Sequence, residues 1–69
     1  MKKFVYEVAG IQFEDTEAFG KAWREAKALA TEKHAAIYRN VISDRREVYT
    51  TGGCFVQADR VEPQYVAIL

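Results

Sequence analysis

The hydrophobic and polar residues of this chain follow two periods, and the longer one lies between Asp15 and Lys33. The apolar residues that recur there at every third or fourth position are Phe19, Ala22, Trp23, Ala26, Leu29 and Ala30. This spacing places side chains on one face of a helix. It therefore predicts one amphipathic helix over residues 15–33, with Asp15 or Thr16 as its N-cap. Gly20 falls in the interior of that helix, where we interpret it as a tolerated defect.

A period of two precedes the predicted helix. Apolar side chains alternate with other residues from Lys3 to Ala9 and again from Ile11 to Glu14, as in strands with one buried face. Gly10 separates the two stretches, so they predict a tight antiparallel hairpin. The glycine is expected to adopt a positive φ in a type I turn closed by a G1 bulge.

A second hairpin is predicted over residues 36–51, because β-branched and aromatic residues return after the helix. Its first strand places Ile37 and Val41 on one face and Tyr38 and Ile42 on the other. Apolar residues on both faces favour a central position in the sheet.

The second hairpin continues with a polar loop, Ser43–Arg46, and a strand, Glu47–Thr51. Gly52 and Gly53 follow. They predict either a two-residue hairpin turn into a strand over residues 54–58 or a bulge within one long bent strand. We favour the turn.

The chain ends with a polar loop, Asp59–Pro63, and an apolar segment, Gln64–Leu69. We expect this segment to pair as a strand, within the sheet or with a second copy, because an exposed tail of this composition would promote aggregation. The sequence therefore predicts an α+β fold of order ββαβββ, with the helix packed on one face of a four- to five-stranded antiparallel sheet. The expected core joins Phe19, Trp23, Ala26 and Leu29 of the helix to Phe4, Tyr6, Val8, Phe13, Ile37 and Val41 of the strands.

The composition indicates one small globular domain over residues 1–69, because 49% of the residues are hydrophobic and 29% are charged. A core of this size supplies roughly 3 to 5 kcal/mol of stability. Cys54 is the only cysteine, so it cannot form an intramolecular disulfide that would supplement the core. Self-association as a homodimer is the remaining common way for so small a chain to gain further stability.

The charge balance disfavours nucleic acid as the main partner, because the ten basic and ten acidic side chains cancel. Glu7 interrupts the apolar run near the start of the chain, which leaves it too short for an export signal. No stretch approaches the roughly 18 apolar residues of a membrane span. We therefore expect a cytoplasmic protein with no membrane partner.

Few side chains suggest a catalytic or metal-binding role. We interpret Cys54 as a small buried hydrophobic residue, and His34 as a cation whose imidazole caps the carbonyl end of the helix. Glu14, Asp15 and Glu17 could supply oxygen ligands to a metal, but the positive end of the helix dipole already explains their position. No catalytic residue, metal site, cofactor or small-molecule ligand is predicted, so we do not expect an enzyme.

Residues 51–58, TGGCFVQA, resemble the core signature of the RNA-recognition motif at Gly52, Phe55 and Val56. The departures from that signature are Thr51 in place of a basic residue, and Gly53 and Ala58 in place of aromatic residues. The predicted fold also lacks the second helix of that family. The resemblance therefore does not imply RNA binding by this segment.

The second hairpin carries Arg39, Arg45 and Arg46, with Tyr38 and Tyr49 on the same hairpin. Arginines beside aromatic residues can contact a nucleic-acid groove or an acidic protein surface. An ordinary solvated loop is the simpler interpretation. Nucleic-acid binding through these arginines is therefore the alternative function.

The leading hypothesis is a small non-enzymatic interaction or regulatory protein that acts through an apolar sheet face or its C-terminal strand, most simply as a homodimer. One helix cannot cover every apolar residue that the strands present, and the excess is expected on the opposite face of the sheet. The residues expected at this protein interface are Tyr38, Ile42, Tyr49, Phe55, Tyr65, Val66 and Ile68. From its size alone, a phage or mobile element is a suggested origin.

Overall fold

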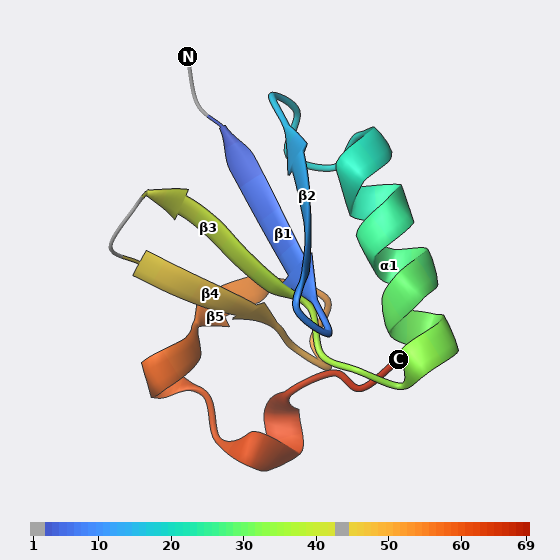
Figure 1. Ribbon diagram of the computed structural model, residues 1–69. Coiled ribbons are helices and arrows are strands. Elements are labelled where there is room, and N and C mark those ends of the chain that lie inside the picture. Colours follow the sequence, from blue (N-terminus) through green and yellow to red (C-terminus); the bar gives the residue numbers. More distant parts are fainter. Residues whose placement is uncertain (1–2, 43–44) are drawn as a thin grey trace.

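The computed structural model describes residues 3–42 and 45–69, and it confirms the predicted α+β fold. The elements in chain order are β1 (Phe4–Val8), β2 (Ile11–Asp15), α1 (Lys21–Lys33), β3 (Tyr38–Ile42), β4 (Arg45–Tyr49), β5 (Phe55–Gln57) and the 3-10 helices η1 (Ala58–Arg60) and η2 (Pro63–Tyr65). The five strands form one antiparallel sheet in the order β2-β1-β3-β4-β5, and α1 packs against β1 and β2 (Figure 1).

The first hairpin has a two-residue turn. Val8 pairs directly with Ile11, and the residues between them, Ala9 and Gly10, have φ values of 51° and 81°. Positive φ at both central positions is the mark of a type I′ turn, whose twist matches that of the flanking strands. The predicted type I turn with a G1 bulge is therefore wrong, although the hairpin itself is confirmed.

The predicted helix is confirmed over its C-terminal part, but it begins at Lys21 and not at Asp15. Asp15 is still in β2, where it pairs with Phe4. Its carboxylate nevertheless serves the helix, because the N–H of Ala22 donates to Oδ2 at 3.1 Å and the N–H of Glu17 donates to Oδ1 at 3.1 Å. Asp15 therefore caps the helix from the preceding strand, across the bend that joins the two elements.

Gly20 is the N-cap of α1, so its interpretation as a defect inside the helix is wrong. A Cβ atom at this position would lie 2.8 Å from Oδ2 of Asp15 and 3.1 Å from Cβ of Glu17. Any larger residue would therefore push the carboxylate away from the start of the helix. The absence of a side chain at Gly20 is what allows the Asp15 cap.

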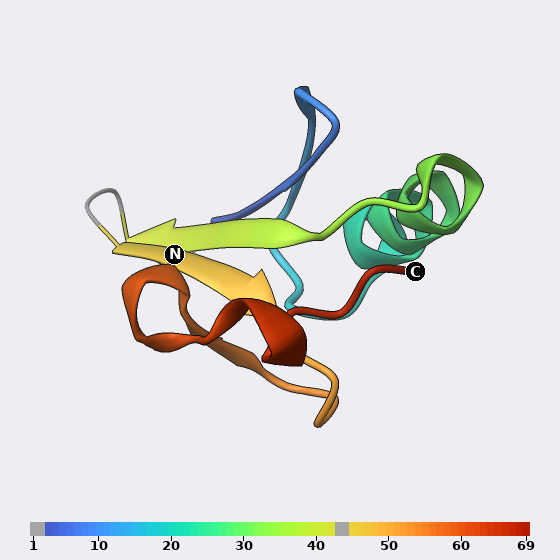
Figure 2. The same ribbon diagram turned by 90° about the horizontal axis from the view of Figure 1, so that it is seen from below.

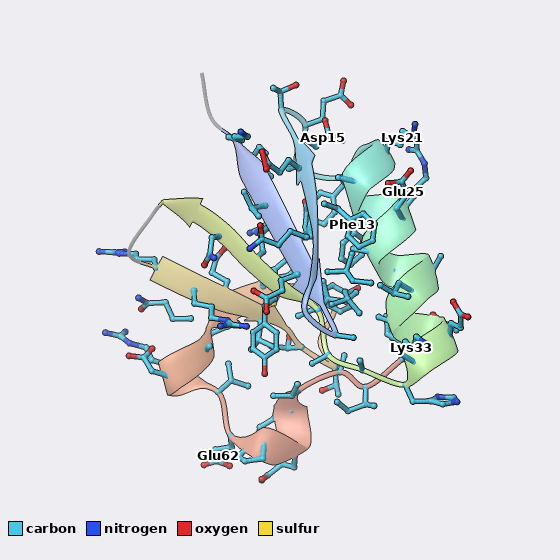
Figure 3. The ribbon with its side chains drawn as sticks, in the orientation of Figure 1. Phe13, Asp15, Lys21, Glu25, Lys33 and Glu62 are labelled. Carbon is cyan, nitrogen blue, oxygen red and sulfur yellow. The ribbon has the colours of Figure 1, made fainter. Side chains whose placement is uncertain are left out.

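The core forms where α1 crosses the first two strands. Ala22, Ala26 and Ala30 recur every four residues along α1 and are all buried. Their small side chains let the helix approach β1 closely, where Tyr6 and Val8 are fully buried. The other buried residue of this core is Ile37, and the partly buried apolar residues packed around it include Phe4, Phe13, Trp23 and Leu29. Figure 3 shows Phe13 between β2 and α1.

Two members of the predicted core need comment. Phe19 precedes α1 and is 56% exposed, so it lies at the edge of the core and not inside it. The side chain of Val41 lies outside the described part of the structure. The predicted core is therefore confirmed for the first hairpin and for the buried face of α1.

The second hairpin is confirmed, with shifted bounds. Arg45 and Arg46 belong to β4 and not to the loop, because they pair with Ile42 and Asn40 of β3. The register shifts between Asn40 and Ile42, which marks a β-bulge in β3. Ser43 and Asp44, the rest of the predicted loop, lie outside the described residues.

A turn at Gly52-Gly53 joins β4 to β5, so the favoured interpretation is confirmed. Tyr49 pairs with Phe55, and the N–H of Thr50 donates to the carbonyl of Cys54 at 3.0 Å. The turn is thus longer than the predicted two residues. Gly53 has a φ of 84°, which only glycine adopts without strain.

The C-terminal segment returns to the end of β4. Val66 pairs with Thr50 in an isolated antiparallel bridge, and the N–H of Ala67 donates to the carbonyl of Tyr49 at 3.0 Å. The tail is therefore paired within the chain, as expected, but by one bridge and not as a full strand. Figure 2 shows this segment running under β4 and ending beside α1. Val48 and Thr50 are buried near this end of β4, against which η1 also packs.

Candidate functional site

An aromatic cluster fills the space between α1 and the second half of the sheet. Trp23 is at its centre, with ring centroids 5.8 Å from Tyr6, 5.4 Å from Phe19, 5.0 Å from Tyr49 and 5.6 Å from Phe55. Tyr49 and Phe55 therefore lie on the face that carries the helix. Their predicted position on the opposite face is wrong. Both side chains are partly buried and engaged in the fold.

Arg39 lies against this aromatic cluster. Its guanidinium carbon is 4.0 Å from the centroid of Phe55, and its Nε and Nη2 atoms each lie 3.0 Å from Oε1 of Glu47. The side chain of Arg39 is only 13% exposed. Because the charge is already neutralised and stacked, Arg39 stabilises the fold here and presents little surface to a partner.

The hydroxyl of Tyr6 is buried in the same region. It has no hydrogen-bond partner among the described residues, although the ring is fully enclosed. Burial raises the pKa of the phenol, and the guanidinium of Arg39 partly offsets that rise. The phenol therefore remains protonated at neutral pH, and burial of a hydroxyl without a hydrogen-bond partner costs free energy.

Arg46 projects from the other face of the sheet. Its guanidinium carbon is 4.1 Å from the centroid of Tyr38, and its Nη2 atom is 3.4 Å from Oε2 of Glu7. Arg45 is exposed on the adjacent position of β4. Arg39 pairs with Glu47, which follows Arg46 on β4. Because neighbouring residues of a strand point to opposite faces, Arg39 and Arg46 lie on opposite faces of the sheet and do not form one basic surface. Nucleic-acid binding through the three arginines stays a prediction that none of these contacts favours.

Cys54 and His34 both differ from the roles expected of them. Cys54 is exposed in the turn after β4, so its predicted burial is wrong; its Sγ atom lies 3.6 Å from Oγ1 of Thr50. His34 ends α1 in the left-handed conformation, with a φ of 52°. It is its backbone N–H, and not its imidazole, that donates to the carbonyl of Ala30.

The acidic residues before α1 have structural partners. Glu14 forms an ion pair with Lys3, and Asp15 accepts the two N–H groups described above. The hydrogen bonds from Ala22 and then from Glu17 lower the pKa of the Asp15 carboxyl below its ordinary value. Within residues 3–42 and 45–69, no three His, Cys, Asp or Glu side chains converge as metal ligands do. No helix in this part of the chain is long and apolar enough to cross a membrane.

We call the surface of the last part of the chain the C-terminal surface: Val56, Val61 and Tyr65 lie there around one hollow with the charged residues Arg60 and Glu62, and Ile68 follows in the same segment. Tyr65 is 54% exposed and Ile68 is 61% exposed. A hollow of about 490 Å³ opens beside Tyr65. The residues that line it are Thr50, Thr51, Gly52, Val56, Arg60, Val61, Glu62 and Tyr65.

The C-terminal surface contains two residues of the predicted interface, Tyr65 and Ile68, and four that the sequence did not indicate. Val66 is half-buried beside it through its bridge to Thr50. Val61 stands alone in a polar stretch, so no periodicity marks it. Tyr38 lies under Arg46 on another part of the sheet, and the side chain of Ile42 lies outside the described residues. The predicted interface residues therefore do not form one patch.

No protein-family model, curated protein or solved structure matches this chain. The candidate site therefore rests on its own geometry. That geometry consists of exposed apolar side chains and a hollow with charged residues at its rim.

Proposed function

We propose that this protein is a small non-enzymatic interaction protein whose contact surface is the C-terminal surface, which binds most simply a second copy of the chain. The observation that supports it is that Tyr65, which is more than half exposed, lines a hollow together with Val56 and Val61, and that Ile68, in the same C-terminal segment, is also more than half exposed. Exposed apolar side chains that occur together, with polar residues around them, mark interaction sites more often than singly exposed ones do.

The energetics favour burial of this surface. Each square ångström of apolar surface removed from water contributes about 25 cal/mol. Tyrosine is enriched at interfaces, because its ring is apolar and its hydroxyl can remain hydrated at the rim. Burial of the outer face of α1 would contribute less free energy to association, since this face carries charged residues such as Lys21 and Glu25 (Figure 3).

The proposal uses fewer residues than the interface expected from the sequence. Tyr49 and Phe55 contact Trp23 inside the aromatic cluster, so exposing them to a partner would weaken the fold. Tyr65 and Ile68 make no such ring contacts among the described residues. Of the interface residues expected from the sequence, they are therefore the ones that remain exposed to a partner.

The test compares the wild-type chain with the double variant Tyr65→Ser, Ile68→Ser by size-exclusion chromatography with light scattering over a concentration series. We expect the wild-type mass to rise towards that of two chains, and the double variant to keep the mass of one. The matched control is Ile11→Ser, because Ile11 is 49% exposed in the first hairpin, outside the C-terminal surface. A wild-type mass of one chain at every concentration, or equal association of the double variant, contradicts the proposal.

A further inference from the structure

We infer that two copies of the chain meet at the C-terminal surface around a two-fold axis that sets Arg60 of each copy against Glu62 of the other. This inference rests on the proposed function and deepens it, because it identifies the partner and the register of the contact. It is drawn from the charges on the rim of the hollow, which are a different observation from the exposed apolar residues.

The rim carries one charge of each sign. Arg60 ends η1, and Glu62 is the residue that precedes η2. Both are exposed, and both line the hollow together with Val61, which lies between them in the sequence. Figure 3 shows Glu62 at the outer edge of the C-terminal segment, away from α1.

Neither charge is paired within the described part of the chain. The ion pairs formed there join Lys3 to Glu14, Lys21 to Glu25, Arg39 to Glu47 and Arg46 to Glu7. Glu62 accepts a hydrogen bond only from a neutral group, Nε2 of Gln64, at 2.9 Å. Arg60 and Glu62 are therefore both free to pair across an interface.

A two-fold axis would place the positive charge of one copy opposite the negative charge of the other. In a symmetric dimer the same patch occurs on both sides, so a residue that contacts a second residue is matched by the reciprocal contact. With the axis close to Val61, the guanidinium of each Arg60 faces the carboxylate of Glu62 in the other copy. Two ion pairs then flank an apolar centre, which is the usual arrangement of a polar rim around a hydrophobic core.

A partner of one charge sign fits the rim less well. An acidic protein would pair with Arg60 but would face Glu62 with a like charge, and a basic protein would do the reverse. Like charges brought together and desolvated at an interface are strongly unfavourable. The mixed rim is complementary to itself across a two-fold axis, which favours a second copy over a partner of one charge sign.

Two charge reversals test the register. Arg60→Glu makes the rim wholly acidic, and Glu62→Arg makes it wholly basic, so each variant alone would place two like-charge contacts across the axis. We expect the dissociation constant of each variant alone to rise at least about tenfold. An equimolar mixture of the two variants restores both opposite-charge contacts, and we expect it to associate within about threefold of the wild type.

The measurement is sedimentation velocity on each variant and on the mixture, with circular dichroism to verify folding. The controls are Arg45→Glu and Glu32→Arg, which make the same changes in net charge at exposed positions outside the C-terminal surface. Both should associate like the wild type.

Each outcome has a distinct meaning. Single variants that associate like the wild type, or a mixture as weak as its components, overturn the register but leave self-association through Tyr65 and Ile68 standing. A wild-type chain that does not associate at all overturns this inference together with the self-association in the proposed function. Loss in the single variants with recovery in the mixture is the expected result.

Discussion

The aromatic cluster around Trp23 and the C-terminal surface around Tyr65 use similar side chains in opposite ways. In the cluster, each ring lies within 7 Å of at least one other ring, and every ring except the exposed Phe19 at its edge is buried or partly buried in the fold. On the C-terminal surface, Tyr65 and Ile68 leave more than half of their side chains in water. Folding and association are therefore assigned to different apolar residues of one small chain.

The covering elements explain the difference. The buried face of α1 consists of alanines, so the helix approaches the first hairpin closely and Trp23 fills the space beside it. The opposite end of the sheet is covered by η1 and η2, which are single turns of three residues each. Val48 and Thr50 are buried at this end of the sheet, but elements this short cannot also enclose their own outward side chains.

Removal of the central ring should have the largest effect on the cluster. Trp23→Ala deletes contacts with four rings, and a large-to-small change of this kind costs about 3 to 5 kcal/mol in the free energy of unfolding. That is close to the whole stability expected of a chain this small. Circular dichroism during urea titration should therefore show an unfolded or barely folded variant. Tyr65→Ala is the comparison in the other region, and equal losses for both variants would remove the distinction.

Enlargement of the alanine face should have the next largest effect. Ala26 is fully buried where α1 meets β1, so Ala26→Leu forces the helix away and should cost about 1 to 3 kcal/mol. Ala28→Leu makes the same change on the exposed side of α1 and should leave the urea midpoint nearly unchanged. A neutral Ala26→Leu would show that the helix does not depend on close approach.

Acid should weaken the attachment of α1 to β2. Because its hydrogen bonds lower the pKa of Asp15 in the folded chain below 3.8, the ionised carboxylate contributes stability above the pKa of the unfolded state, and this contribution is lost as the pH falls through the folded value. Asp15→Asn should be less stable than the wild type at pH 7, and the difference should shrink in acid. Urea midpoints of both proteins from pH 7 down to pH 2 measure this difference. A difference that stays constant with pH would contradict the capping role of the Asp15 carboxylate.

The smallest expected effect has the opposite sign. The hydroxyl of Tyr6 is buried without a partner among the described residues, so Tyr6→Phe removes an unsatisfied group and keeps the ring. Stability should rise by up to about 1 kcal/mol, as measured by the urea midpoint. A loss of stability in Tyr6→Phe would mean that the hydroxyl is hydrogen-bonded in solution.

The sequence predicted the fold class and the two hairpins because alternation of side chains follows directly from strand geometry. The predicted start of α1 lies too early in the chain. Phe19 fits the helical spacing, so the predicted helix extends back to Asp15, which belongs to β2. The predicted cap residue acts on the helix all the same, but from the preceding strand. The contact between Asp15 and the start of the helix depends on the absence of a side chain at Gly20, and the periodicity of apolar residues does not reveal such a contact.

The candidate site was harder to predict, because the face on which a strand residue lies depends on its register with neighbouring strands. The bulge in β3 and the long turn between Thr50 and Cys54 change that register, which moved Tyr49 and Phe55 to the side of the helix. Cys54 is exposed for the same reason, since it belongs to the turn and not to β5. Tyr65 and Ile68 could be identified from the apolar tail, whereas Arg60 and Glu62 required the structure.

The most direct test of the C-terminal surface is a dilution series followed by two-dimensional proton–nitrogen NMR of the wild-type chain. We expect backbone signals of residues 56–68 to shift with concentration, while the signals of α1 stay in place. Shifts confined to the outer face of α1 or to β2, or a spectrum that does not change with concentration, would contradict the assignment of association to this surface.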